Sequence, residues 1–178
     1  MGNKGKIHLY YGPGKGKTTA AIGTVLRFLG HDSSAVVLQF MKGNQSIGSE
    51  YGEITYLNDV ESVDIFQYPT RHLTPDMSLT QDEQGRIQTG INKAKDAVSA
   101  ADTDVVVLDE LSLLWAFDIC DVKTILNICS AKRERTELLI TGRQAPPELV
   151  DRADYVTYMA EIKHPYQKDV PPREGVER

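Results

Sequence analysis

Short apolar runs alternate along this chain with longer segments in which apolar residues recur every three or four positions. The first pattern predicts strands, and the second predicts amphipathic helices. The predicted strands cover 7–11, 35–40, 63–67, 105–110, 137–142 and 155–162, and the predicted helices cover 18–29, 81–100, 122–131 and 146–153. Strands that alternate with helices predict an α/β fold, with a mostly parallel sheet and helices on both of its faces.

The segments between these elements are polar or rich in residues that break regular structure. Residues 41–52 are rich in Gly, Ser and Asn, and residues 68–77 contain two prolines, so we expect loops at both places. Thr80 followed by Glu83 predicts a capping box at the start of the helix over 81–100. The polar C-terminal tail, residues 167–178, is expected to be loosely held.

Length, charge and cysteine content limit the classes of protein to consider. The 178 residues fit one domain, 1–178, and the net charge of −5 argues against a nucleic-acid partner. Cys120 and Cys129 do not form a Cys-x-x-Cys pair, which argues against a zinc site. We find neither a signal peptide nor an apolar run near the roughly 18 residues of a membrane span, so we expect a cytoplasmic protein with no membrane partner.

The segment 12–19, Gly-Pro-Gly-Lys-Gly-Lys-Thr-Thr, joins the first predicted strand to the first predicted helix. Its glycines permit a close approach of the backbone to phosphate, and amides at a helix N-terminus bind anions. Lys17 is expected to reach the terminal phosphates, and the Thr18 hydroxyl to ligate Mg²⁺. The loop is one residue shorter than the usual motif, with Tyr11 where its first glycine would stand. The pattern predicts nucleotide binding but leaves the reaction open.

A second candidate feature is the pair Asp109-Glu110 at the end of the apolar run 105–110. The carboxyl ends of parallel strands form the edge where ligands bind in open sheets. One of these carboxylates could therefore hold Mg²⁺ opposite Thr18. The pair alone could equally be a solvated strand end, and the phosphate loop upstream favours the metal-binding interpretation.

Five motifs give the chain a more specific resemblance. They lie at 12–19, 39–43, 107–111, 140–148 and 162–165. In this order they resemble the ATP:corrinoid adenosyltransferases of the CobA/CobO/BtuR type, in which the shortened phosphate loop is itself the family pattern. The resemblance extends over about residues 6–177.

The resemblance implies a RecA-like P-loop α/β domain that forms a homodimer. It implies an enzyme that transfers the 5′-deoxyadenosyl group of ATP to a Co(I) corrinoid, with Mg²⁺ or Mn²⁺ bound to the nucleotide. The products would be triphosphate and adenosylcobalamin or an adenosylated precursor, and a flavoprotein-type reductant would supply Co(I). Because Co(I) is itself a strong nucleophile, such an enzyme needs no activated serine or cysteine.

The same resemblance assigns roles to residues of this chain. It implies Lys17, Asp109 and Glu110 as catalytic residues, and Thr18 and Glu110 as metal ligands. Lys42 and Gly43 would line the corrinoid side. The implied ATP-binding residues are Gly12, Pro13, Gly14, Lys15, Gly16, Lys17, Thr18, Thr19, Lys42 and Arg143. For Arg143, whose strand-end position suggests contact with phosphate or a neighbouring carboxylate, a helix-capping or interdomain salt bridge is an equal alternative.

The sequence departs from the family pattern on the corrinoid side. Gln45 stands where relatives often have tryptophan, and 68–72 replaces a usual aromatic pair. Trp115, the only tryptophan, could form an apolar corrinoid wall with its apolar neighbours, although a core or dimer contact is favoured. The alternatives to an adenosyltransferase are a RecA-like nucleoside kinase and a non-catalytic ATP-binding relative. The absence of a Cys-x-x-Cys zinc motif argues against a thymidine-kinase-like chain.

Overall fold

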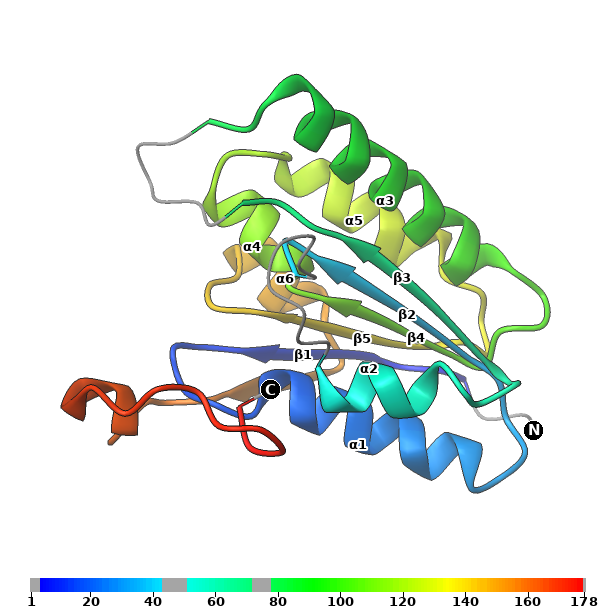
Figure 1. The fold of residues 1–178 in the computed structure, drawn as a ribbon. Helices are drawn as coiled ribbons and strands as arrows, with labels where there is room; N and C mark the ends of the chain where they lie inside the picture. The colour runs from blue at the N-terminus through cyan, green and yellow to red at the C-terminus, as the bar shows by residue number, and fades with distance from the viewer. Residues whose placement is uncertain (1–3, 43–50, 72–77, 178) are drawn as a thin grey trace.

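The structure is a computed structural model that describes residues 4–42, 51–71 and 78–177. Six strands form one sheet in the order β3-β2-β4-β5-β1-β6, and all neighbouring pairs are parallel (Figure 1). The strands are β1 (Ile7–Tyr11), β2 (Ala35–Phe40), β3 (Val63–Tyr68), β4 (Val105–Asp109), β5 (Glu137–Gly142) and β6 (Tyr155–Tyr158). The predicted α/β class with a parallel sheet is confirmed.

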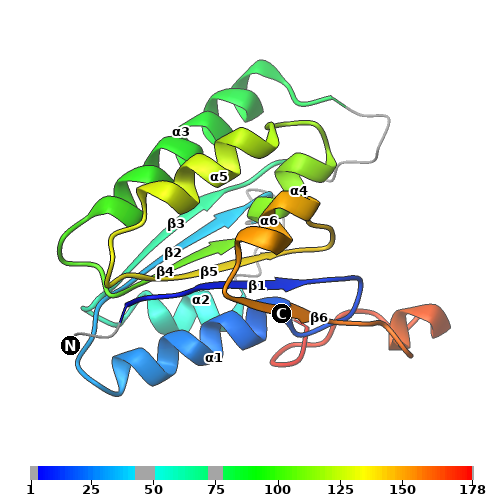
Figure 2. The same ribbon diagram turned by 180° about the vertical axis from the view of Figure 1, so that it is seen from behind.

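Helices cover both faces of this sheet, as the sequence predicts (Figures 1 and 2). One face carries α1 (Lys17–Leu29) and α2 (Gly52–Leu57). The other face carries α3 (Gln81–Ser99), α4 (Leu111–Ala116), α5 (Val122–Ala131) and α6 (Pro147–Arg152). A 3₁₀ helix, η1 (Pro165–Lys168), follows β6. No helix within the described ranges has the length and apolar character required to cross a membrane.

The core lies in two layers because successive side chains of a strand point to opposite faces of the sheet. In β4, Val105 and Val107 pack in the layer that contains the buried residues of α1. Val106 and Leu108 pack in the layer formed with α3 and α5. All five residues of β4 are buried, which is typical of a central strand in a parallel sheet.

The structure corrects several predicted boundaries. The helices α2 and α4 were not predicted, and β6 ends at Tyr158 rather than at 162. The strand predicted over 105–110 ends at Asp109, because Glu110 has a φ of 61° and is the N-cap of α4. The capping box of α3 is confirmed, with Thr80 accepting from the Glu83 amide and Glu83 accepting from the Thr80 amide.

Strand order brings the two predicted halves of the site together. The phosphate loop follows β1, and Asp109 ends β4, while β5 lies between these two strands. Since all the strands are parallel, their carboxyl ends meet at the same edge of the sheet. The end of β5 thus separates the loop from the carboxylate pair.

Candidate active site

The phosphate loop joins Tyr11 at the end of β1 to Lys17 at the start of α1. Gly12 and Gly16 have φ values of 121° and 108°, a region that side chains disfavour. A Cβ on Gly14 would lie 2.6 Å from the carbonyl oxygen of Ala160, so only glycine fits where the loop passes the segment after β6. The glycine-rich loop is therefore shaped by both its own conformation and its packing.

Lys17 is folded back onto this loop. Its Nζ donates hydrogen bonds to the carbonyl oxygens of Gly12, at 2.8 Å, and Gly14, at 2.7 Å. The side chain is buried, and burial is the main reason that the pKa of Lys17 is lowered from its ordinary value. The Lys17 ammonium thus bridges two carbonyl groups of the loop and stabilises its conformation.

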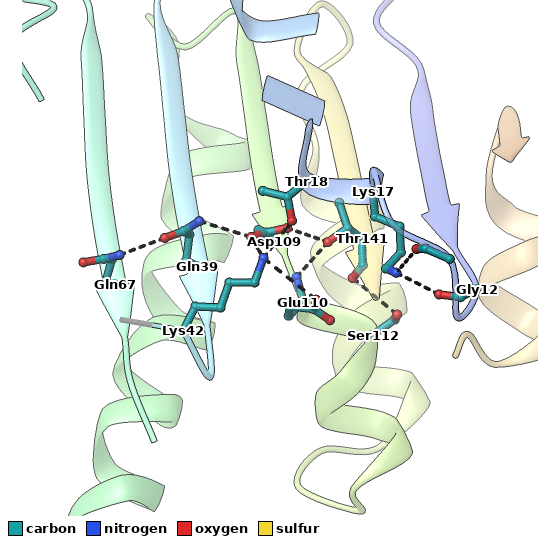
Figure 3. A network of polar contacts seen from close by, with 11 residues as sticks. Gly12, Lys17, Thr18, Gln39, Lys42, Gln67, Asp109, Glu110, Ser112 and Thr141 are labelled. Atoms are coloured by element: carbon teal, nitrogen blue, oxygen red, sulfur yellow. Dashed lines mark hydrogen bonds and ion pairs between the residues drawn. The ribbon is translucent and has the colours of Figure 1, made fainter. Parts of the chain in front are cut away.

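Asp109 lies at the centre of a buried polar network (Figure 3). Its carboxylate is fully buried and accepts four hydrogen bonds. Oδ1 accepts from the hydroxyls of Thr18, at 2.8 Å, and Thr141, at 2.7 Å, while Oδ2 accepts from Gln39 Nε2, at 3.2 Å, and Lys42 Nζ, at 2.7 Å. Both oxygens of this buried carboxylate are therefore satisfied by donors.

This network extends across the sheet through residues in matched register. Gln67 of β3 pairs with Gln39 of β2, and Gln39 pairs with Asp109 of β4. Gln67 Nε2 donates to Gln39 Oε1 at 2.8 Å, and Thr141 of β5 bonds to the far side of Asp109 (Figure 3). No role for Gln67, Gln39 or Thr141 was predicted. The available signal was a polar residue at the same position near the end of neighbouring apolar strands.

Glu110 lies beside Asp109 but has far fewer contacts. Its backbone amide donates to Thr141 Oγ1 at 2.9 Å, and its Oε1 lies 3.9 Å from Lys42 Nζ. Its Oε2 is buried and has no hydrogen-bond partner among the described residues. Burial is the main reason that the pKa of Glu110 is raised above its ordinary value of 4.5. An unpartnered carboxylate oxygen at this place fits a cation.

A cavity of about 590 Å³ opens over these residues. Its volume is in the range of small-molecule sites in proteins. It is lined by the loop and the start of α1, the carboxylate side, the start of α2 and the end of the tail: Lys15, Gly16, Lys17, Thr18, Thr19, Lys42, Tyr51, Gly52, Glu53, Glu110, Gly175, Val176 and Glu177. The structure thus brings most of the predicted nucleotide-binding residues to one cavity.

The tail contributes a wall that was not predicted. Gly175, Val176 and Glu177 line the cavity, whereas the sequence predicted a loosely held segment. Arg173 donates hydrogen bonds to the carboxylate of Glu177 from its backbone amide and its guanidinium, and these hold the pKa of Glu177 at about 2. A polar tail gives no apolar periodicity, so its return to the phosphate loop had no signal in the sequence.

A second cavity, of about 520 Å³, is lined in part by Pro13 of the phosphate loop. Arg143 is exposed and lines this cavity rather than the one over the phosphate loop. Trp115 is partly buried against the core and also lines this cavity, whereas its neighbour Leu114 is a core residue. The remaining lining residues are Tyr11, Gln144, Ala145 and Tyr158.

Other residues of the motifs and departures named in the sequence lie elsewhere or outside the described part of the chain. Gly43 and Gln45 fall in 43–50, and His72 falls in 72–77, both outside the described residues. His164 caps η1 by accepting from the Tyr166 amide at 3.1 Å. Among the described residues, no group of three or more His, Cys, Asp or Glu could hold a metal. A metal here would therefore need hydroxyl, phosphate or water ligands in addition to carboxylates.

The sequence of this chain is similar to one protein family and to several known proteins. The sequence model of the family described as ATP:corrinoid adenosyltransferase BtuR/CobO/CobP matches residues 3–178. The corrinoid adenosyltransferase of Sinorhizobium sp is 29% identical over 98% of this chain and 80% of the relative. Corrinoid adenosyltransferase of Escherichia coli K12 is 28% identical, and corrinoid adenosyltransferase CobA of Salmonella typhimurium is 29% identical, each over 98% of this chain and 86% of the relative.

Proposed function

We propose that this chain, which belongs to the ATP:corrinoid adenosyltransferase family BtuR/CobO/CobP, transfers the 5′-deoxyadenosyl group of ATP to the Co(I) centre of a corrinoid. The observation that carries the proposal is the cavity of about 590 Å³, in which the phosphate loop faces Lys42 and Glu110. ATP and the corrinoid are the two substrates that family membership implies. A nucleoside kinase, the alternative reading of a P-loop fold, is not favoured by these relatives.

In this reaction the electron pair of Co(I) forms the bond to C5′ of ATP, and the cobalt becomes Co(III). The bond between C5′ and the triphosphate oxygen breaks, and triphosphate leaves with that electron pair. The protein therefore needs no nucleophile of its own. Burial raises the pKa of Cys120 and of Cys129 to about 11, which keeps both thiols protonated at neutral pH.

The phosphate loop acts on the leaving group. Lys17 exchanges the carbonyl oxygens of Gly12 and Gly14, which it contacts at 2.8 and 2.7 Å, for oxygens of the triphosphate. The N-terminus of α1, which begins at Lys17, adds its positive dipole end. Both place positive charge where negative charge grows as the C5′–O bond breaks.

A divalent cation fits beside this loop. The Thr18 hydroxyl and the Glu110 carboxylate are hard oxygen ligands of the kind that Mg²⁺ and Mn²⁺ bind. The buried, unpartnered Oε2 of Glu110 supports this assignment. Asp109 accepts a hydrogen bond from Thr18 and so orients that hydroxyl. When bound, the metal would neutralise negative charge on the triphosphate.

We place the corrinoid against the second cavity. Trp115, Tyr11 and Tyr158 give it an aromatic lining, and Pro13 joins it to the phosphate loop. A corrin ring has broad apolar faces, which aromatic side chains cover well. This position keeps the cobalt close to a nucleotide held by the loop. Arg143, which lines the same cavity, contacts the corrinoid or the nucleotide from this side.

The enzyme's oligomeric state, its cellular compartment and its corrinoid substrates are also part of the proposed function. All 178 residues form one catalytic domain, which works as a homodimer. The edge strand β6 supports this, since Tyr155 and Tyr158 are more than half exposed there. The enzyme acts in the cytoplasm, where a flavoprotein-type reductant supplies Co(I). Cob(I)alamin and cob(I)yrinic acid a,c-diamide are the proposed corrinoid substrates.

An anaerobic assay with ATP, Mg²⁺ and chemically reduced cobalamin tests the reaction. We expect loss of the Co(I) absorbance, a light-sensitive alkylcorrinoid and one triphosphate per corrinoid. ADP as the product would indicate a kinase and contradict the proposal. Bound ATP with unchanged Co(I), both for cobalamin and for an incomplete corrinoid, would indicate a non-catalytic relative.

A further inference from the structure

Lys42 holds a central position among the proposed metal ligands (Figure 3). Its Nζ lies 2.7 Å from Thr18 Oγ1, 2.7 Å from Asp109 Oδ2 and 3.9 Å from Glu110 Oε1. The ammonium thus contacts the hydroxyl and both carboxylates at once. These oxygens belong to the same residues that the proposed function assigns to the divalent cation and its immediate support.

An ammonium and Mg²⁺ cannot share this place. Mg²⁺ contacts its oxygen ligands at roughly 2.0–2.1 Å and keeps several waters around it. Nζ is already within hydrogen-bond distance of Thr18 and Asp109, so a metal bound to Thr18 and Glu110 would lie against another positive charge. The two cations would repel each other at contact distance.

The described residues provide no equivalent substitute for Lys42 as the counter-ion. Asp109 is fully buried and the side chain of Glu110 is 13% exposed, so two neighbouring carboxylates are removed from water. Lys17 donates to the carbonyls of Gly12 and Gly14 rather than to these carboxylates. Buried charges without a partner are costly, so a cation at this place stabilises the fold.

Lys42 is also placed so that it can leave. It follows β2 by two residues, and its side chain is 19% exposed. It lines the nucleotide cavity, and its Nζ lies 5.8 Å from the centre of the Tyr51 ring. Rotation of its own side chain therefore moves the ammonium from the carboxylates toward the space of the triphosphate.

We propose that Lys42 is a built-in cation that occupies the position of the divalent metal and is displaced when the metal–triphosphate complex binds. The inference rests on the proposed metal role of Thr18 and Glu110. It gives Lys42 a positioning role, in which it keeps Thr18, Asp109 and Glu110 together until the metal replaces it. After displacement, its ammonium remains in the cavity and pairs with a phosphate oxygen.

Binding of Mn²⁺ without nucleotide, followed by electron paramagnetic resonance, tests this inference. We expect Lys42→Met and Lys42→Gln to bind Mn²⁺ at least about tenfold more tightly than the wild-type protein, because a like charge at contact distance is removed. Lys42→Arg keeps the charge and should bind no more tightly than wild type. Lys15→Met is the matched control, since Lys15 lines the same cavity without an ion pair to either carboxylate within the described residues.

The melting temperature, measured with and without Mg²⁺, tests the inference even for Lys42 variants that fold poorly. If Lys42 is a stand-in for the metal, Mg²⁺ should raise the melting temperature of Lys42→Met far more than that of wild type. A variant that stays unfolded at saturating Mg²⁺ would show that the metal cannot replace the ammonium, and would overturn the inference. Equal Mn²⁺ affinity in wild type and in both neutral variants would also overturn it.

Mn²⁺ binding in the presence of ATP separates this inference from the proposed function. If wild type binds Mn²⁺ together with ATP but the neutral variants show no gain without ATP, only the role of Lys42 is wrong. If no variant binds Mn²⁺ with or without ATP, the assignment of Thr18 and Glu110 as metal ligands is wrong and the inference is overturned with it.

Discussion

At the scale of single residues, two lysines of the site are paired with oxygen atoms of the protein itself. Lys17 contacts loop carbonyls, and Lys42 contacts Thr18 and Asp109. The sequence predicted Lys17, Thr18, Asp109 and Glu110 because each belongs to a motif with a known spacing. It could not predict which partner each side chain contacts, since Lys42 and Asp109 are 67 positions apart and meet only through strand order.

Replacement of Lys17 tests the phosphate loop. We expect Lys17→Ala to lower kcat/KM by roughly 10²–10³, the usual cost of removing a group that stabilises charge in the transition state. Its fold should persist, because the loop carbonyls that Lys17 contacts can bind water once the side chain is gone. Lys123→Ala, an exposed change in α5, is the control and should leave kcat/KM unchanged. Wild-type activity in Lys17→Ala would remove Lys17 from the mechanism.

The buried carboxyl of Glu110 predicts a pH effect on stability. Because burial raises its folded pKa above the ordinary value of 4.5, the ionisation of Glu110 destabilises the fold as pH rises through and above that value. Without added metal, Glu110→Gln should therefore melt at a higher temperature than wild type at neutral pH. The difference in melting temperature should shrink as pH falls through 4.5 and vanish well below it, where Glu110 is protonated in both the folded and the unfolded protein. Thermal melts across this pH range, with Glu61→Gln as an exposed comparison, give the measurement.

At the scale of elements, periodicity and turn residues predicted all six strands and the longer helices. Short elements escaped because six residues, the length of both α2 and α4, show less than two helical turns of pattern. The apolar segment after Glu110 continues the apolar run of β4, and only the left-handed φ of 61° at Glu110 separates strand from helix. A backbone angle of this kind is set by packing and cannot be read from glutamate in a sequence.

Gly14 in the phosphate loop and Gly23 in α1 differ in whether their surroundings leave room for a side chain. A Cβ on Gly14 would lie 2.6 Å from the carbonyl oxygen of Ala160, whereas one on Gly23 in α1 would contact nothing within 4 Å. Gly14→Ala should displace the loop and weaken ATP binding by about tenfold or more, as calorimetry would measure. Gly23→Ala should instead stabilise the protein by about 0.5–1 kcal/mol with unchanged ATP affinity. Equal ATP affinity in both variants would contradict this account of the loop.

The position of Trp115 on α4 predicts a selective effect on the corrinoid. Trp115→Ala should raise the KM for the corrinoid by about tenfold, the cost of losing a well-packed aromatic contact, and leave the KM for ATP nearly unchanged. Tyr56→Ala removes an exposed aromatic ring from α2 and is the control. A rise in both KM values would indicate that Trp115 supports the core rather than the corrinoid.

At the scale of the whole molecule, the phosphate loop and the Asp109-Glu110 pair lie at the same edge of the sheet. The strand order β3-β2-β4-β5-β1-β6 puts Thr141 between the phosphate loop and Asp109. Alternation of elements predicted a parallel sheet but not this order, because several orders satisfy the same pattern. Order is fixed by non-local pairings, of which the polar row from Gln67 to Thr141 is the part that serves the site.

The tail completes the nucleotide cavity from the far end of the chain. Gly175, Val176 and Glu177 line it, while most residues of 170–177 are exposed and bury little of the core. Deleting 170–178 should therefore leave the fold intact and raise the dissociation constant for ATP severalfold. The deleted side chains carry two arginines and two glutamates, so their net charge is zero. The expected loss is then one of contact and not of charge.

Calorimetry of ATP binding at low and high salt separates these two causes. A loss of contact gives the same ratio of dissociation constants, deletion to wild type, at both salt concentrations, whereas a loss of charge gives a ratio that shrinks as salt rises. Arg173→Ala should reproduce part of the effect, because Arg173 bonds to the carboxylate of Glu177 from within the tail. If the deletion binds ATP more tightly than wild type, the tail obstructs the cavity, and its role as a wall is wrong.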